Sequence, residues 1–174
     1  NWDLPSVSDY GTDQVFFFRD VAEEVARLHL VLEQCGVKKG DKVALVGKDC
    51  ARWCITYMAT ITCGAVIVPI LQDFNPNDIH HIINHSESVV LFVSDRIWDT
   101  LEEEKIPDVQ VAFSLTDFHC ILRREGMPSR LRHEDVDALM VRKYPAGFTK
   151  EDIRYAEVGN EELIEINYTS GTTD

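Results

Sequence analysis

The chain has 174 residues, of which 45% are apolar, and this length suits one domain, or a large part of one, with a buried core. The net charge of −13 argues against a nucleic-acid partner and an anionic membrane surface, because both would repel the chain. Every apolar run is far shorter than the roughly 20 residues that span a bilayer. Five cysteines, an odd number without a CxxC pair, are typical of reduced, buried thiols, so we expect a cytoplasmic protein.

The first predicted helix covers residues 18–35, where apolar side chains recur at helical spacing. Gly36 follows directly, as a glycine at a helix C-terminus does. A turn at residues 38–41 then leads into a short β-rich run at residues 43–46. This order is the start of an alternating α/β chain.

The second predicted helix, residues 51–63, carries apolar side chains on most of its sides, which is typical of a helix buried between a sheet and other elements. Asp49 is its possible N-cap, because a carboxylate there can accept from the free N–H groups of the first turn. Gly64 ends the helix, and residues 65–70 form the next apolar strand.

A third helix begins after Asn75, which can cap it, with Pro76 in the first helical position, where a missing N–H costs nothing. Residues 89–93 form the next strand, a continuous apolar run. An acidic helix is expected at residues 95–104, and residues 109–115 form a further strand.

Strands that are apolar on both faces and alternate with helices predict an α/β fold: a doubly wound, largely parallel sheet with helices on both faces. Residues 117–157 interrupt this pattern with many charges, and we expect a surface excursion with one short helix; a partner-binding element is the alternative. Thr149 begins a capping-box sequence that has Asp152 in place of glutamate. A last apolar run, residues 163–166, predicts a buried strand.

Two pairs of metal-type side chains lie four residues apart, Cys50 with Cys54 and His81 with His85. Neither pair has a second pair that would complete a four-ligand zinc site. We expect the cysteines to pack in the interior and the histidines to face solvent, since isoleucines take the buried side of that helix. The sequence therefore predicts neither a metal ligand nor a nucleophile–base pair.

The most specific pattern lies at residues 168–173, which read Tyr-Thr-Ser-Gly-Thr-Thr just after the last predicted strand. Glycine lets the backbone approach an anion closely, while hydroxyls and successive N–H groups supply donors without a cationic side chain. The Gly-Lys-Ser/Thr ending of a Walker-type loop is absent, and such a run is also typical of a flexible linker. The candidate phosphate-binding residues are Thr169, Ser170, Gly171, Thr172 and Thr173.

Residues 168–173 resemble the phosphate loop of the adenylate-forming enzymes, the AMP-binding superfamily that includes the acyl-CoA synthetases. The leading Tyr168 makes this loop most like that of the long-chain fatty-acid–CoA ligases. Across residues 15–115 and 158–173 the order and spacing of the segments also fit the family. Three further stretches are similar to it, a strand entry at 36–45, a helix-to-strand turn at 64–70 and a strand at 89–93.

This resemblance implies an enzyme that uses ATP to join a carboxylic acid, expected to be a fatty acid, to AMP and then to coenzyme A, with Mg²⁺ on the phosphates. The five candidate residues would hold the β- and γ-phosphates of ATP. Family members are several times longer, so we expect the N-terminal part of such an enzyme, without the downstream remainder and C-terminal domain and inactive alone. Its expected parts are a core at 15–116, a charged excursion at 117–157, and a strand plus phosphate loop at 158–174.

Asp174 departs from the family, which has a small residue, usually glycine, at this place. A carboxylate there would repel a triphosphate. Two alternatives stay open: an adenylation domain that activates amino or aryl acids, and a non-catalytic α/β binding module that keeps the loop as a structural turn.

Overall fold

The computed structural model describes residues 1–125 and 133–169 of the chain. Its centre is a five-stranded sheet with the order β4-β3-β5-β6-β7. The first four of these strands run parallel, and β7 runs antiparallel to β6 at the edge, so the predicted largely parallel sheet is confirmed. The strands are β3 (Lys42–Val46), β4 (Val66–Ile70), β5 (Ser88–Val93), β6 (Val111–Ser114) and β7 (Cys120–Arg123).

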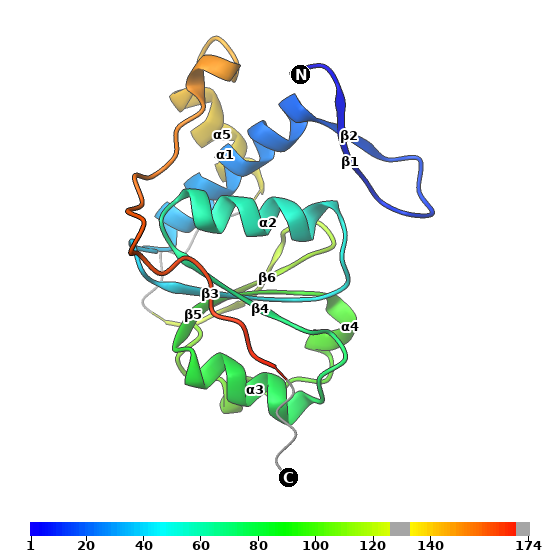
Figure 1. Ribbon diagram of the computed structural model, residues 1–174, viewed down its shortest axis with the longest axis vertical. Helices are drawn as coiled ribbons and strands as arrows, with labels where there is room; N and C mark the ends of the chain where they lie inside the picture. Colours follow the sequence, from blue (N-terminus) through cyan, green and yellow to red (C-terminus); the bar gives the residue numbers. More distant parts are fainter. Residues whose placement is uncertain (126–132, 170–174) are drawn as a thin grey trace.

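Helices cover both faces of this sheet (Figure 1), which makes the fold doubly wound, as predicted. Among the described residues no helix has the length and apolarity to cross a bilayer. One face carries α1 (Phe18–Gln34), α2 (Ala51–Thr62) and α5 (His133–Lys143), and the other carries α3 (Pro76–His85) and α4 (Asp95–Trp98). The remaining elements are a hairpin of β1 (Pro5–Ser8) and β2 (Val15–Phe17), which the sequence did not predict, and the 3₁₀ helices η1 (Glu103–Lys105) and η2 (Lys150–Asp152).

The parallel strands are buried on both faces, which is why they are continuous apolar runs in the sequence. Along β3, Leu45 belongs to the apolar cluster under α1 and α2, whereas Ala44 belongs to the cluster under α3. At the centre of the sheet, Phe92 of β5 is fully buried and stacks on Phe113 of β6 with ring centroids 5.2 Å apart. The core therefore has two layers, one on each side of the sheet.

The N-terminus of α2 is not capped by Asp49, contrary to the prediction. Cys50 occupies the N-cap position without a side-chain hydrogen bond, and the backbone N–H of Ala51 donates to Oδ1 of Asp9 at 2.6 Å. Asp9 belongs to the loop between β1 and β2, so a segment 42 residues earlier supplies the cap. The unpredicted hairpin thus has a structural role at the start of α2.

Helix α3 begins as predicted, with the backbone N–H of Asp78 donating to Oδ1 of Asn75 at 3.0 Å. The helix predicted at residues 95–104 is wrong in its length, because α4 covers four residues and a 3₁₀ turn follows. The backbone N–H of Glu102 donates to Nε2 of His80 at 3.0 Å. This bond to the buried side of α3 replaces a bond along a continuing helix.

The prediction of a buried strand at residues 163–166 is wrong. Leu163 and Ile164 are 57% and 43% exposed. Within the described chain, the sheet pairing of this segment is a single parallel bridge between Glu165 and Ile67 of β4. The segment lies along the outer edge of β4, where the sheet covers it on one side only, so its apolar side chains stay partly exposed.

The charged stretch 117–157 contributes more to the core than the predicted surface excursion would. Strand β7 extends the sheet at its edge, with Leu122 buried. Helix α5, the predicted short helix, packs Val136 and Met140 into the cluster on the α1 side. The predicted capping box at η2 is present, since Thr149 N–H donates to Oδ2 of Asp152 at 2.8 Å.

Candidate functional site

Of the five predicted phosphate-binding residues, the structure describes Thr169; Ser170, Gly171, Thr172 and Thr173 lie outside the described residues. Thr169 is an exposed residue. The described structure gives the path by which the chain reaches Thr169. Contacts with β4, α2, the turn before β3 and α3 fix this path.

The first contacts lie at the edge of the sheet, where the C-terminal segment runs beside β4 (Figure 1). The N–H of Ile67 donates to the carbonyl of Ile164 at 2.9 Å, and the N–H of Ile166 donates to the carbonyl of Ile67 at 3.0 Å. From α2, the Tyr57 hydroxyl donates to the Glu165 carboxylate at 2.5 Å. This bond, together with burial, raises the pKa of Tyr57 to about 12, so the phenol remains a donor at neutral pH.

The turn before β3 holds the chain further upstream. Lys39 Nζ lies 2.7 Å from Oε2 of Glu162 and donates to the carbonyl of Glu157 at 3.1 Å. The hydrogen bond from Lys39 lowers the pKa of the Glu162 carboxyl. The sequence marked Lys39 only as a turn residue, and no local pattern signals a partner 123 residues away.

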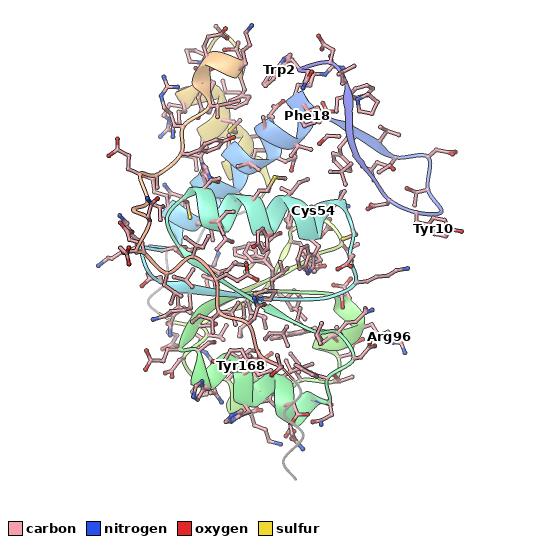
Figure 2. The ribbon with its side chains drawn as sticks, viewed as in Figure 1. Trp2, Tyr10, Phe18, Cys54, Arg96 and Tyr168 are labelled. Atoms are coloured by element: carbon pink, nitrogen blue, oxygen red, sulfur yellow. The ribbon has the colours of Figure 1, made fainter. Side chains whose placement is uncertain are left out.

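The last contact before Thr169 is made by Tyr168, which lies against α3 (Figure 2). The Tyr168 hydroxyl is 2.7 Å from Nδ1 of His85, the last residue of α3. The two rings meet edge to face with centroids 5.7 Å apart, and the ring of His81 lies 5.7 Å from that of His85. Both histidines are exposed, as predicted, but His85 also has a partner 83 residues away that the sequence did not indicate.

The carboxyl ends of β3 and β5 are where a doubly wound sheet usually binds ligands, because the following connections diverge to opposite faces there. In this chain the loops at these ends pack against each other. A Cβ added at Gly47 would lie 2.6 Å from Cδ1 of Leu115 and 3.4 Å from Cβ of Ser94. Next to them, the Ser114 hydroxyl donates to Asp95 at 2.5 Å. The contacts at this junction are structural, so the candidate site remains Thr169 and the segment that leads to it.

A cavity of about 490 Å³ lies on the α1 side of the sheet, between α1, α2 and the segment after α5. Its walls are mainly apolar and include Trp2 and Phe18 (Figure 2). The polar part of the wall includes His29, whose Nε2 lies 2.8 Å from the Thr62 hydroxyl and whose pKa is lowered mainly by burial. Thr169 does not line this cavity, so the cavity is separate from the predicted site.

Four of the five cysteines are poor nucleophiles, because burial disfavours their thiolates. Burial raises the pKa of Cys35 to about 12, and it also raises the pKa values of Cys54, Cys63 and Cys120. Of the five, Cys35 is buried and the others are half-buried, so Cys50 and Cys54 are less enclosed than predicted. Within residues 1–125 and 133–169, no three His, Cys, Asp or Glu side chains converge as metal ligands would.

Proteins with a similar sequence align with nearly the whole chain. Crotonobetaine/carnitine–CoA ligase of Proteus mirabilis is 28% identical over 169 residues, which are 95% of this chain and 30% of that enzyme. Long chain acyl-CoA synthetase 5 of Arabidopsis thaliana is 30% identical over 92 residues, which are 53% of this chain and 13% of that protein. The chain thus spans under a third of the length of these relatives.

Solved structures of CoA ligases have a similar fold. The anthranilate CoA ligase AuaEII, crystallised with anthranoyl-AMP, matches with a TM-score of 0.73 at 20% identity, over 97% of this chain and 29% of that one. The family model of the AMP-binding enzymes matches residues 3–173, a range that includes the predicted loop. On this match the chain belongs to the AMP-binding enzyme family.

Proposed function

We propose that the enzyme containing this chain uses ATP to convert a carboxylic acid into an acyl-adenylate and then transfers the acyl group to coenzyme A. The observation that carries this proposal is the family match through residues 3–173, which includes the candidate loop. The named relatives support it, because they are CoA ligases and a CoA synthetase, and one structural relative holds anthranoyl-AMP. Formation of an acyl-AMP and ligation of the acyl group to coenzyme A are the two stages of the proposed reaction.

In the first stage a carboxylate oxygen attacks the α-phosphorus of ATP, the bond from that phosphorus to the bridging oxygen breaks, and pyrophosphate leaves. In the second stage the sulfur of coenzyme A attacks the acyl carbon, and AMP leaves with the carboxyl oxygen. We assign Thr169, Ser170, Gly171, Thr172 and Thr173 to the β- and γ-phosphates, where their hydroxyl and N–H donors would stabilise negative charge. Mg²⁺, when bound, would neutralise part of the charge of the phosphates.

In this proposal the chain is the N-terminal part of the enzyme, and residues 158–174 bring the phosphate loop to the site. The chain alone is then inactive, because it covers only 30% of the length of the crotonobetaine/carnitine–CoA ligase. The proposed location is the cytoplasm, since the five cysteines are all free thiols and a reducing compartment keeps them so.

A fatty acid is the proposed substrate. The support is the Tyr-Thr-Ser-Gly-Thr-Thr loop, which resembles that of long-chain ligases, and the 30% identity to the Arabidopsis long-chain synthetase over 53% of the chain. The bacterial relative named for crotonobetaine and carnitine covers 95% of the chain at 28% identity. Short polar acids are therefore the competing substrates in the test.

The test is ATP–pyrophosphate exchange by the full-length protein with a panel of acids: long- and short-chain fatty acids, crotonobetaine, anthranilate and several amino acids. We expect exchange that is fastest with a long-chain acid, and acyl-CoA formation when coenzyme A is added. Faster exchange with anthranilate or an amino acid would contradict the fatty-acid substrate. If coenzyme A then gave no acyl-CoA from that acid, the assignment would move to an adenylation domain for aryl or amino acids. If no acid supported exchange, the proposed enzymatic activity would be contradicted and a non-catalytic binding module would be favoured.

A further inference from the structure

We propose that His85 is a positioning residue for the phosphate loop and that it acts through Tyr168. The inference rests on the proposed function, because it assumes that Thr169 and the residues after it bind the phosphates of ATP. His85 itself lies outside the candidate loop, at the C-terminal end of α3. Its side chain reaches the chain one residue before Thr169.

Besides the Tyr57–Glu165 hydrogen bond, the C-terminal segment has two further attachments within a few residues. The first is the pair of backbone bonds that tie Ile164 and Ile166 to Ile67, at 2.9 and 3.0 Å. The second is the Tyr168 hydroxyl at 2.7 Å from Nδ1 of His85. Consecutive Cα atoms are 3.8 Å apart, so a fixed Tyr168 leaves Thr169 little freedom of position. Without the second attachment, the chain beyond the β4 edge would lose this restraint.

The contact between His85 and Tyr168 combines a hydrogen bond with ring packing. The rings are nearly perpendicular, with an interplanar angle of 89° and centroids 5.7 Å apart. The ring of His81, one turn earlier on α3, lies against His85 on the helix surface. The hydrogen bond can form with either charge state of His85. A neutral imidazole accepts from the phenol through Nδ1, and an imidazolium donates from Nδ1 to the phenol oxygen.

Loss of the contact between His85 and Tyr168 should slow the first half-reaction and not the second. The triphosphate is present only during adenylation, so a misplaced loop should weaken ATP use and leave thioester formation from acyl-AMP unchanged. Loss of one net hydrogen bond is worth roughly a 5- to 10-fold change. We therefore expect the KM for ATP in pyrophosphate exchange to rise about 5- to 10-fold in His85→Ala. His85→Asn should restore much of the loss, because the side-chain amide can take the place of Nδ1.

The experiment uses the full-length protein with His85→Ala, His85→Asn, Tyr168→Phe and the double variant His85→Ala/Tyr168→Phe. His81→Ala is the matched control, since His81 is on the same exposed helix face with its ring beside that of His85. Within the part of the chain that the structure describes, the Tyr168 hydroxyl bonds to His85 and not to His81. We measure the KM for ATP and kcat of exchange, thioester formation from preformed acyl-AMP, and urea unfolding. The expected result is a raised KM for ATP in His85→Ala and Tyr168→Phe, a double variant no worse than the singles, and rescue by His85→Asn.

Three results would overturn the inference. They are a normal KM for ATP in His85→Ala, additive losses in the double variant, and equal losses in both half-reactions. The last would mean that His85 acts on folding. If the wild-type protein exchanges pyrophosphate and the KM for ATP of His85→Ala is normal, only the inference is contradicted. A wild-type protein without exchange contradicts the proposed function and the inference with it.

Discussion

Replacing Asp9 with alanine removes the acceptor that caps α2 from the β1–β2 loop. The N–H of Ala51 donates to Oδ1 of Asp9 at 2.6 Å, and Ala51 is fully buried, so water cannot replace the lost acceptor easily. Loss of an N-cap side chain costs about 0.5–2 kcal/mol, and loss of a negative charge at a helix N-terminus costs about 0.3–1 kcal/mol. Because the site is buried, we expect Asp9→Ala to lower the free energy of unfolding by about 1–2 kcal/mol.

The assay is urea unfolding followed by far-UV circular dichroism. With a slope of about 2 kcal/mol per molar urea, Asp9→Ala should lower the midpoint by about 0.5–1 M. Asp9→Asn keeps an oxygen acceptor and loses the charge, so its loss should be about 0.3–1 kcal/mol. Asp49→Ala is the matched control, because Asp49 is the cap that sequence reasoning selected and the structure rejects. Equal midpoints for Asp9→Ala and Asp49→Ala would refute the assignment of the cap.

Other predictions concern the core and the pH dependence of stability. In the same unfolding assay, Phe92→Ala should lower the free energy of unfolding by about 3–5 kcal/mol, because the ring is fully buried and stacked on its neighbour in β6. Leu71 is 62% exposed, so Leu71→Ala should change the free energy of unfolding by less than about 0.5 kcal/mol. Equal effects would contradict the two-layer core. His29 and His80 both have pKa values lowered from 6.5, mainly by burial, so their contribution to stability is present above about pH 6.5 and is lost as the pH falls below it. The free energy of unfolding should therefore decrease from pH 7.5 to pH 5, by at most about 1.4 kcal/mol per pH unit for each histidine. His29→Gln should make this decrease smaller. The same decrease in His29→Gln as in the wild type would contradict the burial of a neutral imidazole at His29.

The features that the sequence predicted well are those set by local patterns. Helix α1 follows the spacing of its apolar residues, and α3 begins where Asn75 can cap it. The strands β3 to β6 were recognisable because a parallel sheet buries both of their faces. Strand β7 was missed because it is a short apolar run beside charged residues, and its pairing with β6 is what makes it a strand.

The features that the sequence did not predict depend on contacts between distant segments. The cap of α2 comes from Asp9, and nothing near Asp49 indicates that another carboxylate takes its place. Residues 163–166 were predicted as buried because they are apolar, but an apolar run does not tell an edge position from a central one. The partnership of Tyr168 with His85 likewise spans 83 residues. The candidate phosphate loop is a prediction from its residue types, while the contacts that lead the chain to it required the structure.

Separate assays of the two half-reactions in the full-length protein test the central claim most directly. Thr169→Val and Thr172→Val each remove one hydroxyl from the proposed phosphate loop, and Thr12→Val, in the exposed β1–β2 loop, is the control. Loss of one donor to a charged oxygen costs about 1.5–3 kcal/mol, so pyrophosphate exchange should fall by roughly one to two orders of magnitude, while thioester formation from preformed acyl-AMP stays near the wild-type rate. Normal exchange in both loop variants, or equal losses in the two half-reactions, would contradict the assignment of residues 169–173 to the phosphates of ATP.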